Sequence, residues 1–172
     1  MASAPSMLSI DEYLRTSYHP DVDYVSGEIE ERNLGEFEHA RLQYILALMF
    51  GRHEREWNVI GVTEQRIYVA RDRVRICDVC LLDRTSKRER VLTTPPLLCI
   101  EILSPEDRLP RVQVVFKDYL DMGVKNIWLL DPIRQIAHTF DAEGLHVVND
   151  TRLTVPNTPI CLDLAEAFAA ID

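Results

Sequence analysis

The sequence predicts an α/β or α+β fold, a mixed β-sheet flanked by helices, in a single domain spanning residues 1–172. The first observation behind this prediction is the order of elements along the chain: a helix, a hairpin, a long helix, several strands, a helix and further strands. The second is size and composition, because 172 residues with 47% hydrophobic and 27% charged side chains suit one domain with a proper core.

The N-terminal part of the chain predicts a short helix and a hairpin. Residues 9–12, SIDE, have the spacing of a capping box, which predicts a helix through about Leu14. Residues 23–32, DYVSGEIEER, predict a hairpin with its turn at Ser26-Gly27.

A long helix is predicted from about Glu36 to Glu54. Its apolar residues at helical spacing are Ala40, Tyr44, Ala47, Leu48 and Gly51, and Ile45, Leu46, Met49 and Phe50 widen that apolar face. A helix with so broad an apolar face is expected to lie across a sheet.

The middle of the chain predicts strands. Apolar runs at residues 57–63, 66–70 and 73–82 read as three strands, and the polar loop DRTSKRER follows them. Pro95-Pro96 bars a helix at the entry to the next run, LLCIEIL, which Ser104-Pro105 closes as a strand.

The C-terminal part predicts a helix, three strands and a last short helix. From about Pro110 to Met122 the sequence reads as a helix with Pro in its first turn and Gly123 as its C-cap. NIWLLDP predicts a buried strand, and QIAHTFD with LHVVND predicts a hairpin through Glu143-Gly144. LDLAEAFAAID has the composition of a short helix.

Bulk charge and composition restrict the classes of function. A net charge of −9 argues against loose electrostatic attraction to nucleic acid, although the cations between Arg66 and Arg90 could form a local basic surface. The first residues lack a signal peptide, and no apolar stretch approaches the roughly 18 residues that span a bilayer. We therefore expect a cytoplasmic protein without membrane contact, whose four cysteines remain free thiols.

Two lone carboxylates stand in apolar strands and are the main candidates for a site. The expected strand faces are Val74, Ile76, Asp78, Cys80 and Leu82 in one run, and Leu97, Cys99, Glu101 and Leu103 in the other. If the two strands are neighbours, Asp78 and Glu101 could converge on a hard cation such as Mg²⁺, which would offset the cost of burying them. Two structural ion pairs with Arg or Lys would explain the same pattern, and the residues alone leave both readings open.

The CDVC segment has the spacing of a zinc or redox motif. In a strand, however, Cys77 and Cys80 are expected to point to opposite faces, and no second CxxC follows. We therefore set this motif aside. The sequence also lacks a P-loop and a GxGxxG segment, so nucleotide binding has no support.

Five segments in order carry a resemblance to a known family: YVSGEI with an acidic residue before it, GEFEHARLQ, RICDVCLLDR, PPLLCIEILSPEDR and DYLDMGVKNIWLLDP. Together they resemble the putative restriction endonuclease family of largely uncharacterised bacterial proteins, within the PD-(D/E)xK nuclease superfamily. The resemblance runs from about Ile10 to His146. It implies the restriction-endonuclease-like fold, a central mixed β-sheet with helices on both sides, and metal-dependent phosphodiester hydrolysis.

The resemblance also implies roles for individual residues. The family's metal carboxylates fall on Asp78 and Glu101, with the main-chain carbonyl of Ile102 as the adjoining ligand. Its hairpin acid falls on Asp23, which would bind metal directly or through water, and its helix-start His falls on His39, which would contact phosphate or a carboxylate. The implied cofactor is Mg²⁺, with Mn²⁺ as a substitute, and the implied substrate is DNA.

The sequence departs from the family pattern at the lysine. Leu103 stands where the superfamily motif has Lys, and Val115 stands where this family commonly carries it on the following helix. The nearest cations are Lys117, roughly 200° round the helix from Val115, and Arg111, one turn earlier on its face. Arginine cannot act as a base because its pKa exceeds about 12, but it could bind phosphate. Catalysis is then weak, uses Lys117 after a register change, or is lost.

Two functions of different classes follow. The leading one is a Mg²⁺-dependent DNA endonuclease with Asp78, Glu101, Lys117 and His39 as its catalytic residues. The alternative is a catalytically impaired nuclease-fold protein that acts as a nucleic-acid-binding or protein-interaction module. A homodimer is plausible by analogy alone.

Overall fold

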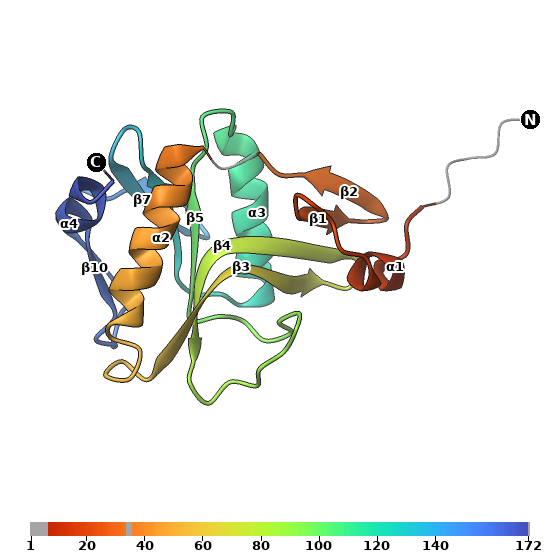
Figure 1. Cartoon of the computed structure of the whole chain (residues 1–172), viewed down its shortest axis with the longest axis horizontal. Helices are drawn as coiled ribbons and strands as arrows, with labels where there is room; N and C mark the ends of the chain where they lie inside the picture. The colour runs from red at the N-terminus through yellow and green to blue at the C-terminus, as the bar shows by residue number, and fades with distance from the viewer. Residues whose placement is uncertain (1–6, 34–35, 172) are drawn as a thin grey trace, which may run out of the picture.

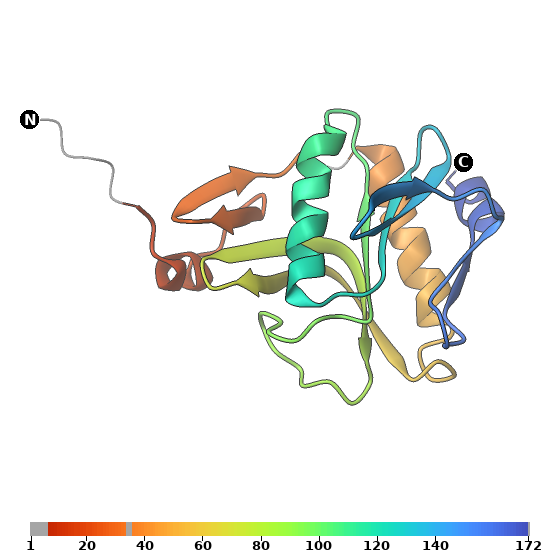
Figure 2. The same ribbon diagram turned by 180° about the vertical axis from the view of Figure 1, so that it is seen from behind.

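The computed structural model describes residues 7–33 and 36–171, and its centre is a mixed β-sheet with helices against both faces (Figures 1 and 2). Within these residues the sheet has eight strands, in the order β2-β1-β4-β5-β6-β7-β8 with β3 paired to β4. Their bounds are β1 Val22–Val25, β2 Glu28–Glu31, β3 Val59–Ala70, β4 Arg73–Asp83, β5 Leu98–Ile102, β6 Ile127–Asp131, β7 Ile136–Asp141 and β8 Gly144–Val147. Strands β5 and β6 run parallel, and the predicted fold class is confirmed.

The helices lie on opposite faces of this sheet. Helix α2, Phe37–Gly51, and helix α4, Leu164–Ala169, cover one face, and helix α3, Leu109–Met122, covers the other (Figures 1 and 2). Helix α1, Ile10–Arg15, packs beside β1 at the end of the sheet. Strands β9, Arg152–Thr154, and β10, Cys161–Asp163, form a separate two-stranded sheet that the sequence had not predicted.

Each face of the sheet carries its own apolar cluster. The cluster beneath α2 and α4 includes Leu46, Phe50 and Trp128, and the cluster beneath α3 includes Phe116 and Tyr119. Burying a large apolar side chain of this kind contributes about 1.5–3 kcal/mol, so the two clusters fix both helix layers. None of the helices in the described part of the chain has the length and apolarity that a bilayer crossing requires.

The sequence signals at the ends of the elements are confirmed. The Ser9 hydroxyl accepts the Glu12 main-chain N–H at 3.2 Å, and the Glu12 carboxylate accepts the Ser9 N–H at 3.1 Å, which completes the capping box of α1. Ser26 and Gly27 form the hairpin turn with φ values of 50° and 94°. Gly123 ends α3 in the left-handed conformation, with φ of 109°.

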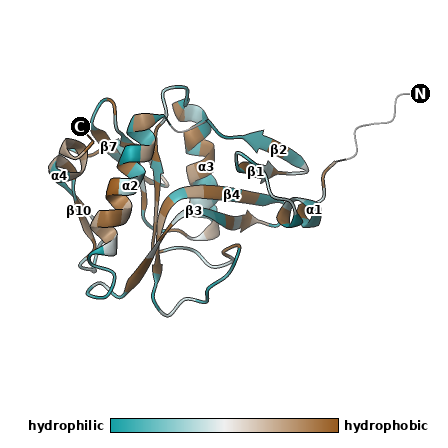
Figure 3. Ribbon diagram, viewed as in Figure 1, coloured by the Kyte–Doolittle hydropathy of each residue, from teal (hydrophilic) through white to brown (hydrophobic). Residues whose placement is uncertain are grey.

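The face of α2 that packs on the sheet differs from the predicted one. The buried residues are Leu42, Ile45, Leu46 and Phe50. Tyr44 and Leu48, at the centre of the predicted stripe, are 57% and 44% exposed, and Figure 3 shows hydrophobic residues on the side of α2 that faces away from the sheet. The prediction was wrong because apolar residues surround most of this helix, so their spacing does not select a face.

Strand β3 replaces two predicted strands. Residues 57–63 and 66–70 were expected to be separate, but one strand continues through both, with Glu64 at the junction in the left-handed conformation (φ 49°). The single strand gives β4 a partner along its whole length.

The side-chain alternation of β4 breaks near Asp78. Cys77 and Cys80 both pack in the cluster beneath α3, whereas Val79 and Leu81 pack beneath α2. The expectations that the even positions share one face, and that the two cysteines point to opposite faces, were therefore wrong. The break coincides with Glu64, which lies across from Asp78 between the pairs Thr63–Val79 and Gln65–Cys77 and has a left-handed backbone conformation.

The second edge of β4 is shared by two strands. Strand β1 pairs with Arg73 and Val74 at the start of β4, and β5 pairs with residues 79–81 near its end. In the described ladders, residues 75–78 have no strand partner on this edge. The divergence of β1 and β5 therefore leaves the edge of β4 next to Asp78 without a neighbouring strand.

Candidate functional site

A cavity of about 90 Å³ lies where β1 and β5 diverge along β4. It brings together six residues that the sequence predicted for the site: Asp23, His39, Asp78, Glu101, Ile102 and Arg111. They come from β1, α2, β4, β5 and the first turn of α3, so the fold gathers at one point residues that are far apart in the sequence.

Asp78 is held from two sides. Its side chain is 2% exposed, its Oδ2 accepts the main-chain N–H of Ile102 at 2.8 Å, and its Oδ1 accepts a hydrogen bond from Arg32 Nη2 at 2.5 Å. Burial raises the pKa of the Asp78 carboxyl group, and the positive charges of Arg32 and His39 oppose that rise. The carboxylate is thus positioned by the end of β5 and paired with a guanidinium group.

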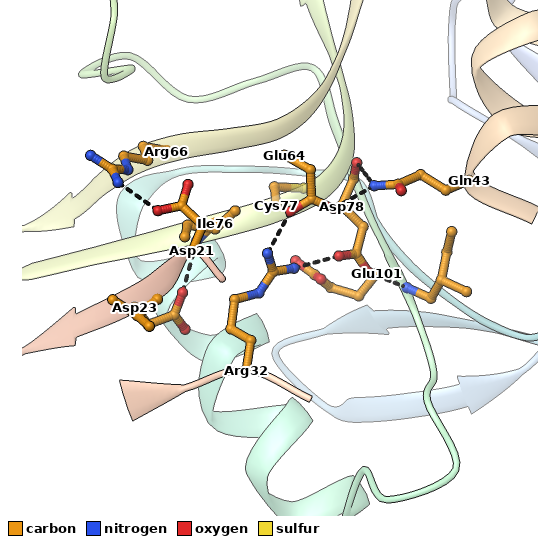
Figure 4. Close-up of polar contacts among 12 residues, drawn as sticks. Asp21, Asp23, Arg32, Gln43, Glu64, Arg66, Ile76, Cys77, Asp78 and Glu101 are labelled. Atoms are coloured by element: carbon orange, nitrogen blue, oxygen red, sulfur yellow. Dashed lines mark hydrogen bonds and ion pairs between the residues drawn. The ribbon is translucent and has the colours of Figure 1, made fainter. Parts of the chain in front are cut away.

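Arg32 is one of the site residues that the sequence did not predict. It follows β2 directly, and its Nη1 lies 2.6 Å from Glu64 Oε2 while its Nη2 reaches Asp78. Figure 4 shows the guanidinium group between these two carboxylates. Burial alone would lower the pKa of Arg32, but the negative charges of Asp78, Glu101 and Glu64 raise it, so the group stays cationic.

Glu101 lies across from Asp78. The β4–β5 ladder pairs Val79 with Ile100, and one further step of that register places Asp78 opposite Glu101. The Tyr119 hydroxyl donates to Glu101 Oε1 at 2.6 Å. Burial and then the charge of Asp78 raise the pKa of Glu101 well above its usual range. The condition for a shared site, that the strands of Asp78 and Glu101 are neighbours, is met.

The main chain of Ile102 also faces Asp78. In an extended strand the N–H and C=O of one residue point toward the same edge, and the Ile102 N–H points at Asp78. The N–H of the next residue, Leu103, donates instead to Leu130 of β6, as the alternation requires. The Ile102 carbonyl is therefore directed to the side of the strand that carries the carboxylates.

His39 approaches the same carboxylate from the first turn of α2. Its Nδ1 lies 3.2 Å from Ser104 Oγ, and its Nε2 lies 3.7 Å from Asp78 Oδ2. Gln43, one helical turn later, donates to Glu64 Oε1 at 2.6 Å and to the Asp78 main-chain oxygen at 2.9 Å. The sequence analysis did not identify Gln43 or Glu64, although the i, i+4 spacing of His39 and Gln43 places them on one face of α2.

Asp23 lines the cavity but has protein partners for both oxygens. Its Oδ1 accepts the Ile76 main-chain N–H at 3.0 Å, and its Oδ2 accepts from Arg75 Nη1 at 3.0 Å. Arg75 also donates to Asp118 and Glu30. Burial raises the pKa of Asp23, and the charge of Arg75 opposes that rise. For this acid the structure matches the ion-pair reading better than the direct metal ligand that the resemblance implied.

The two helix cations are placed differently. Lys117 is exposed and does not line the cavity, so the structure does not bring it to the other predicted site residues. Arg111 lines the cavity, and its Nη2 donates to the Glu31 main-chain oxygen at 2.6 Å. Val115 and Leu103 line the cavity as well, so the positions where a lysine was sought contribute apolar surface.

The donor set fits a hard divalent cation. When ionised, Asp78, Glu64 and Glu101 bring three negative charges to the surroundings of Arg32, whose single positive charge leaves two uncompensated. One ligand atom each from His39, Glu64 and Asp78 lie within 4.8 Å of one another. Carboxylate and carbonyl oxygens are the ligands that Mg²⁺ prefers, and a divalent charge would balance the cluster.

Comparisons with known proteins agree with this picture. A family model described as "Putative restriction endonuclease" matches residues 10–167. Among solved structures, a crystal structure of a putative nuclease from Anabaena variabilis is similar, at 18% sequence identity and a TM-score of 0.81 over 96% of this chain and 99% of that chain. At that identity the likeness shows the fold alone. No curated protein matches the chain.

Proposed function

The chain belongs to the Uma2 family, described as "Putative restriction endonuclease", and from this premise we propose that it is a Mg²⁺-dependent endonuclease that hydrolyses DNA phosphodiester bonds. Family membership and the similar putative nuclease support a nuclease. The dependence on Mg²⁺ and the choice of DNA are the parts that we add. These two parts rest on one observation: the carboxylates of Asp78 and Glu101 lie across from each other on adjacent strands and line the same cavity.

The proposed metal ligands are Asp78, Glu101 and the main-chain carbonyl of Ile102. A bound Mg²⁺, or Mn²⁺ as its substitute, would neutralise phosphate charge and supply an activated water. The chain's own residues prepare this chemistry. The Ile102 N–H fixes the orientation of Asp78, the Tyr119 hydroxyl fixes Glu101, and Ser104 orients His39 toward Asp78. His39 and Arg111 are the proposed phosphate contacts, because both line the cavity and can donate hydrogen bonds.

The alternative function remains a nuclease-fold protein with impaired catalysis that binds nucleic acid or another protein. The observation in its favour is that lysine is absent from the described lining of the cavity, where the apolar Leu103 and Val115 stand instead. Such a protein would bind DNA without cutting it.

A second copy of the chain is the protein partner that we propose. The exposed side of α2 presents Phe37, Tyr44 and Leu48, which are 69%, 57% and 44% exposed. Clustered apolar side chains on a helix face are typical of contact surfaces. Light scattering on the purified chain and on Leu48→Glu tests this proposal, because a homodimer through α2 should become a monomer in the variant.

The cytosol is the compartment that we propose, supported by the free thiols of Cys77, Cys80, Cys99 and Cys161.

Calorimetric metal titration and DNA cleavage test the main proposal together. The parent chain is expected to bind Mg²⁺ or Mn²⁺ and to cut DNA, whereas Asp78→Ala and Glu101→Ala should lose both properties. Metal binding and DNA binding without cleavage would favour the impaired alternative. Metal binding that is equal in the parent and in both variants would remove Asp78 and Glu101 from the site.

A further inference from the structure

The cavity has few positive charges of its own. Among its described lining residues the cations are Arg32 and Arg111, together with His39 when protonated. Arg111 is exposed and already donates to the Glu31 main-chain oxygen. Arg32 is the cation that lies among the carboxylates, with a side chain only 22% exposed. Phosphodiester hydrolysis builds up negative charge on phosphate oxygens, and a fixed cation beside them stabilises that charge.

Arg32 has an anchor that does not depend on the proposed metal ligands. Its Nη1 bonds Glu64 Oε2 at 2.6 Å, while Glu64 Oε1 accepts from Gln43 Nε2 at 2.6 Å. Gln43 therefore holds Glu64 in place from α2. If a metal draws Asp78 away from Nη2, Glu64 still holds the guanidinium group in the cavity.

The charges of the cluster allow Arg32 and a divalent cation to be present together. When Asp78, Glu64 and Glu101 are all ionised, Arg32 offsets one of their three negative charges, and a residual charge of two remains for a metal. An Nη2 group released from Asp78 would point into the cavity with its N–H donors free. A guanidinium group donates in a planar fork that matches two phosphate oxygens, but it does not transfer a proton at neutral pH.

We propose that Arg32 is a catalytic residue of this site that contacts the scissile phosphate and stabilises its developing negative charge. This inference rests on the proposed nuclease function. In the metal-free protein Arg32 bonds Asp78, and in the loaded site it stays tethered to Glu64 while its second arm turns to the phosphate. The chain after β2 thus supplies a positive charge beside the carboxylates, in addition to the one that Arg111 offers from α3.

The test compares the parent with Arg32→Met, Arg32→Lys and the double variant Arg32→Met/Val115→Lys. Val115 lines the same cavity from α3, so the double variant returns a cation from the opposite wall. Arg66→Met is the matched control, because Arg66 forms an equally short pair with Asp21, at 2.5 Å, outside this cavity. Each full-length protein is titrated with Mn²⁺ by calorimetry and assayed for cleavage of a DNA duplex with the metal saturating.

Arg32→Met is expected to keep its affinity for Mn²⁺ and to lose about 10²–10³-fold in kcat with a smaller change in KM, the usual cost of removing one donor to a developing oxyanion. Arg32→Lys should retain more activity, because it keeps the charge and loses the fork. The double variant should recover part of the loss, which a purely structural role for Arg32 would not allow. Arg66→Met should cut DNA like the parent.

Two outcomes would overturn the inference while the nuclease function stands. Arg32→Met could bind Mn²⁺ more tightly and cut DNA as fast as the parent, which would make Arg32 a competitor of the metal. Alternatively, Arg32→Lys could be as inactive as Arg32→Met with no recovery in the double variant, which would make Arg32 structural. If Arg32→Met does not fold, Arg32→Lys decides the matter through its kcat at unchanged metal affinity. A parent chain that neither binds Mn²⁺ nor cuts DNA would overturn the proposed function itself.

Discussion

The main-chain N–H of Ile102 donates to Asp78 Oδ2 at 2.8 Å, so the end of β5 fixes a carboxylate that belongs to β4. This bond lies just beyond the last ladder pair, Val79 with Ile100, because it joins the residue before Val79 to the second residue after Ile100. The Asp78 side chain therefore accepts a backbone N–H that has no partner in the β4–β5 ladder, at the point where the two strands separate. Structure and site are coupled here, because the same carboxylate that closes the strand gap faces the cavity.

The first prediction concerns the stability of the metal-free protein. Asp78→Ala leaves the buried Ile102 N–H and one arm of Arg32 without a partner. A broken buried pair costs about 3–5 kcal/mol. We expect the free energy of unfolding to decrease by an amount near the lower end of this range, because Arg32 keeps its bond to Glu64. Asp78→Asn retains an acceptor for the Ile102 N–H, so its free energy of unfolding should decrease less. Urea unfolding in the presence of a chelator measures both, and an unchanged midpoint for Asp78→Ala would contradict the pairing.

The second prediction concerns pH. Burial and the charge of Asp78 raise the pKa of Glu101, so the folded protein holds this proton to higher pH than the unfolded chain, whose Glu ionises near about 4.3. From that pH up to the raised value, the folded state binds more protons than the unfolded state, and stability falls as pH rises. Glu101→Gln removes this loss. Without metal, the variant should match the parent at low pH and be more stable at neutral pH.

Thermal unfolding from pH 4 to pH 8 in a chelator checks the sign of this effect. The side-chain amide oxygen that Glu101→Gln introduces can still accept from the Tyr119 hydroxyl, so the comparison isolates the charge. Parallel stability curves for the two proteins would show that Glu101 titrates normally. A parent that gains stability from pH 5 to pH 7 relative to the variant would reverse the assignment.

The third prediction separates Asp23 from the metal. Both of its oxygens have protein partners, the Ile76 N–H and Arg75, and Arg75 is 2% exposed. Asp23→Ala is expected to cost about 3–5 kcal/mol of unfolding free energy, because it leaves Arg75 with an incomplete set of partners. Its affinity for Mn²⁺, measured by calorimetry below the melting temperature, should equal that of the parent. A loss of metal binding in a folded Asp23→Ala protein would restore this acid as a ligand.

Much of the fold could be predicted from local signals in the sequence. The capping box at Ser9, the left-handed turn at Ser26-Gly27 and the C-cap at Gly123 are short-range features whose backbone chemistry does not depend on distant residues. The face of α2 that packs on the sheet could not be predicted from such local signals. Its residues are apolar nearly all round, so the choice between Leu42 and Tyr44 as the buried residue is made by the sheet.

The site shows the same division. Asp78 and Glu101 stand out because each is a single acid in an apolar strand, which is a pattern that the sequence displays. Arg32 does not stand out, because it lies in the polar, largely acidic run EIEERN, where a cation is ordinary. Its role arises only when the β1–β2 hairpin is set against β4 and the guanidinium group reaches Asp78 across 46 positions of sequence. Long-range pairing of this kind leaves no local signature.

The last prediction is the response of stability to metal. A ligand that binds only the folded state stabilises it by mass action, by about 2.7 kcal/mol at a concentration one hundred times its dissociation constant. Saturating Mn²⁺ should therefore raise the melting temperature of the parent and of Asp23→Asn, and leave the melting temperatures of Asp78→Asn and Glu101→Gln unchanged.

The rise in melting temperature should grow from pH 5 to pH 7, because the metal competes with the proton that the raised pKa holds on Glu101. A Na⁺ salt at the same ionic strength controls for general ionic effects. Since Asp23→Asn and Asp78→Asn remove the same charge from the same cavity, a metal effect that survives in one and disappears in the other would depend on position rather than on net charge. An equal rise in all four proteins would place the metal elsewhere on the surface.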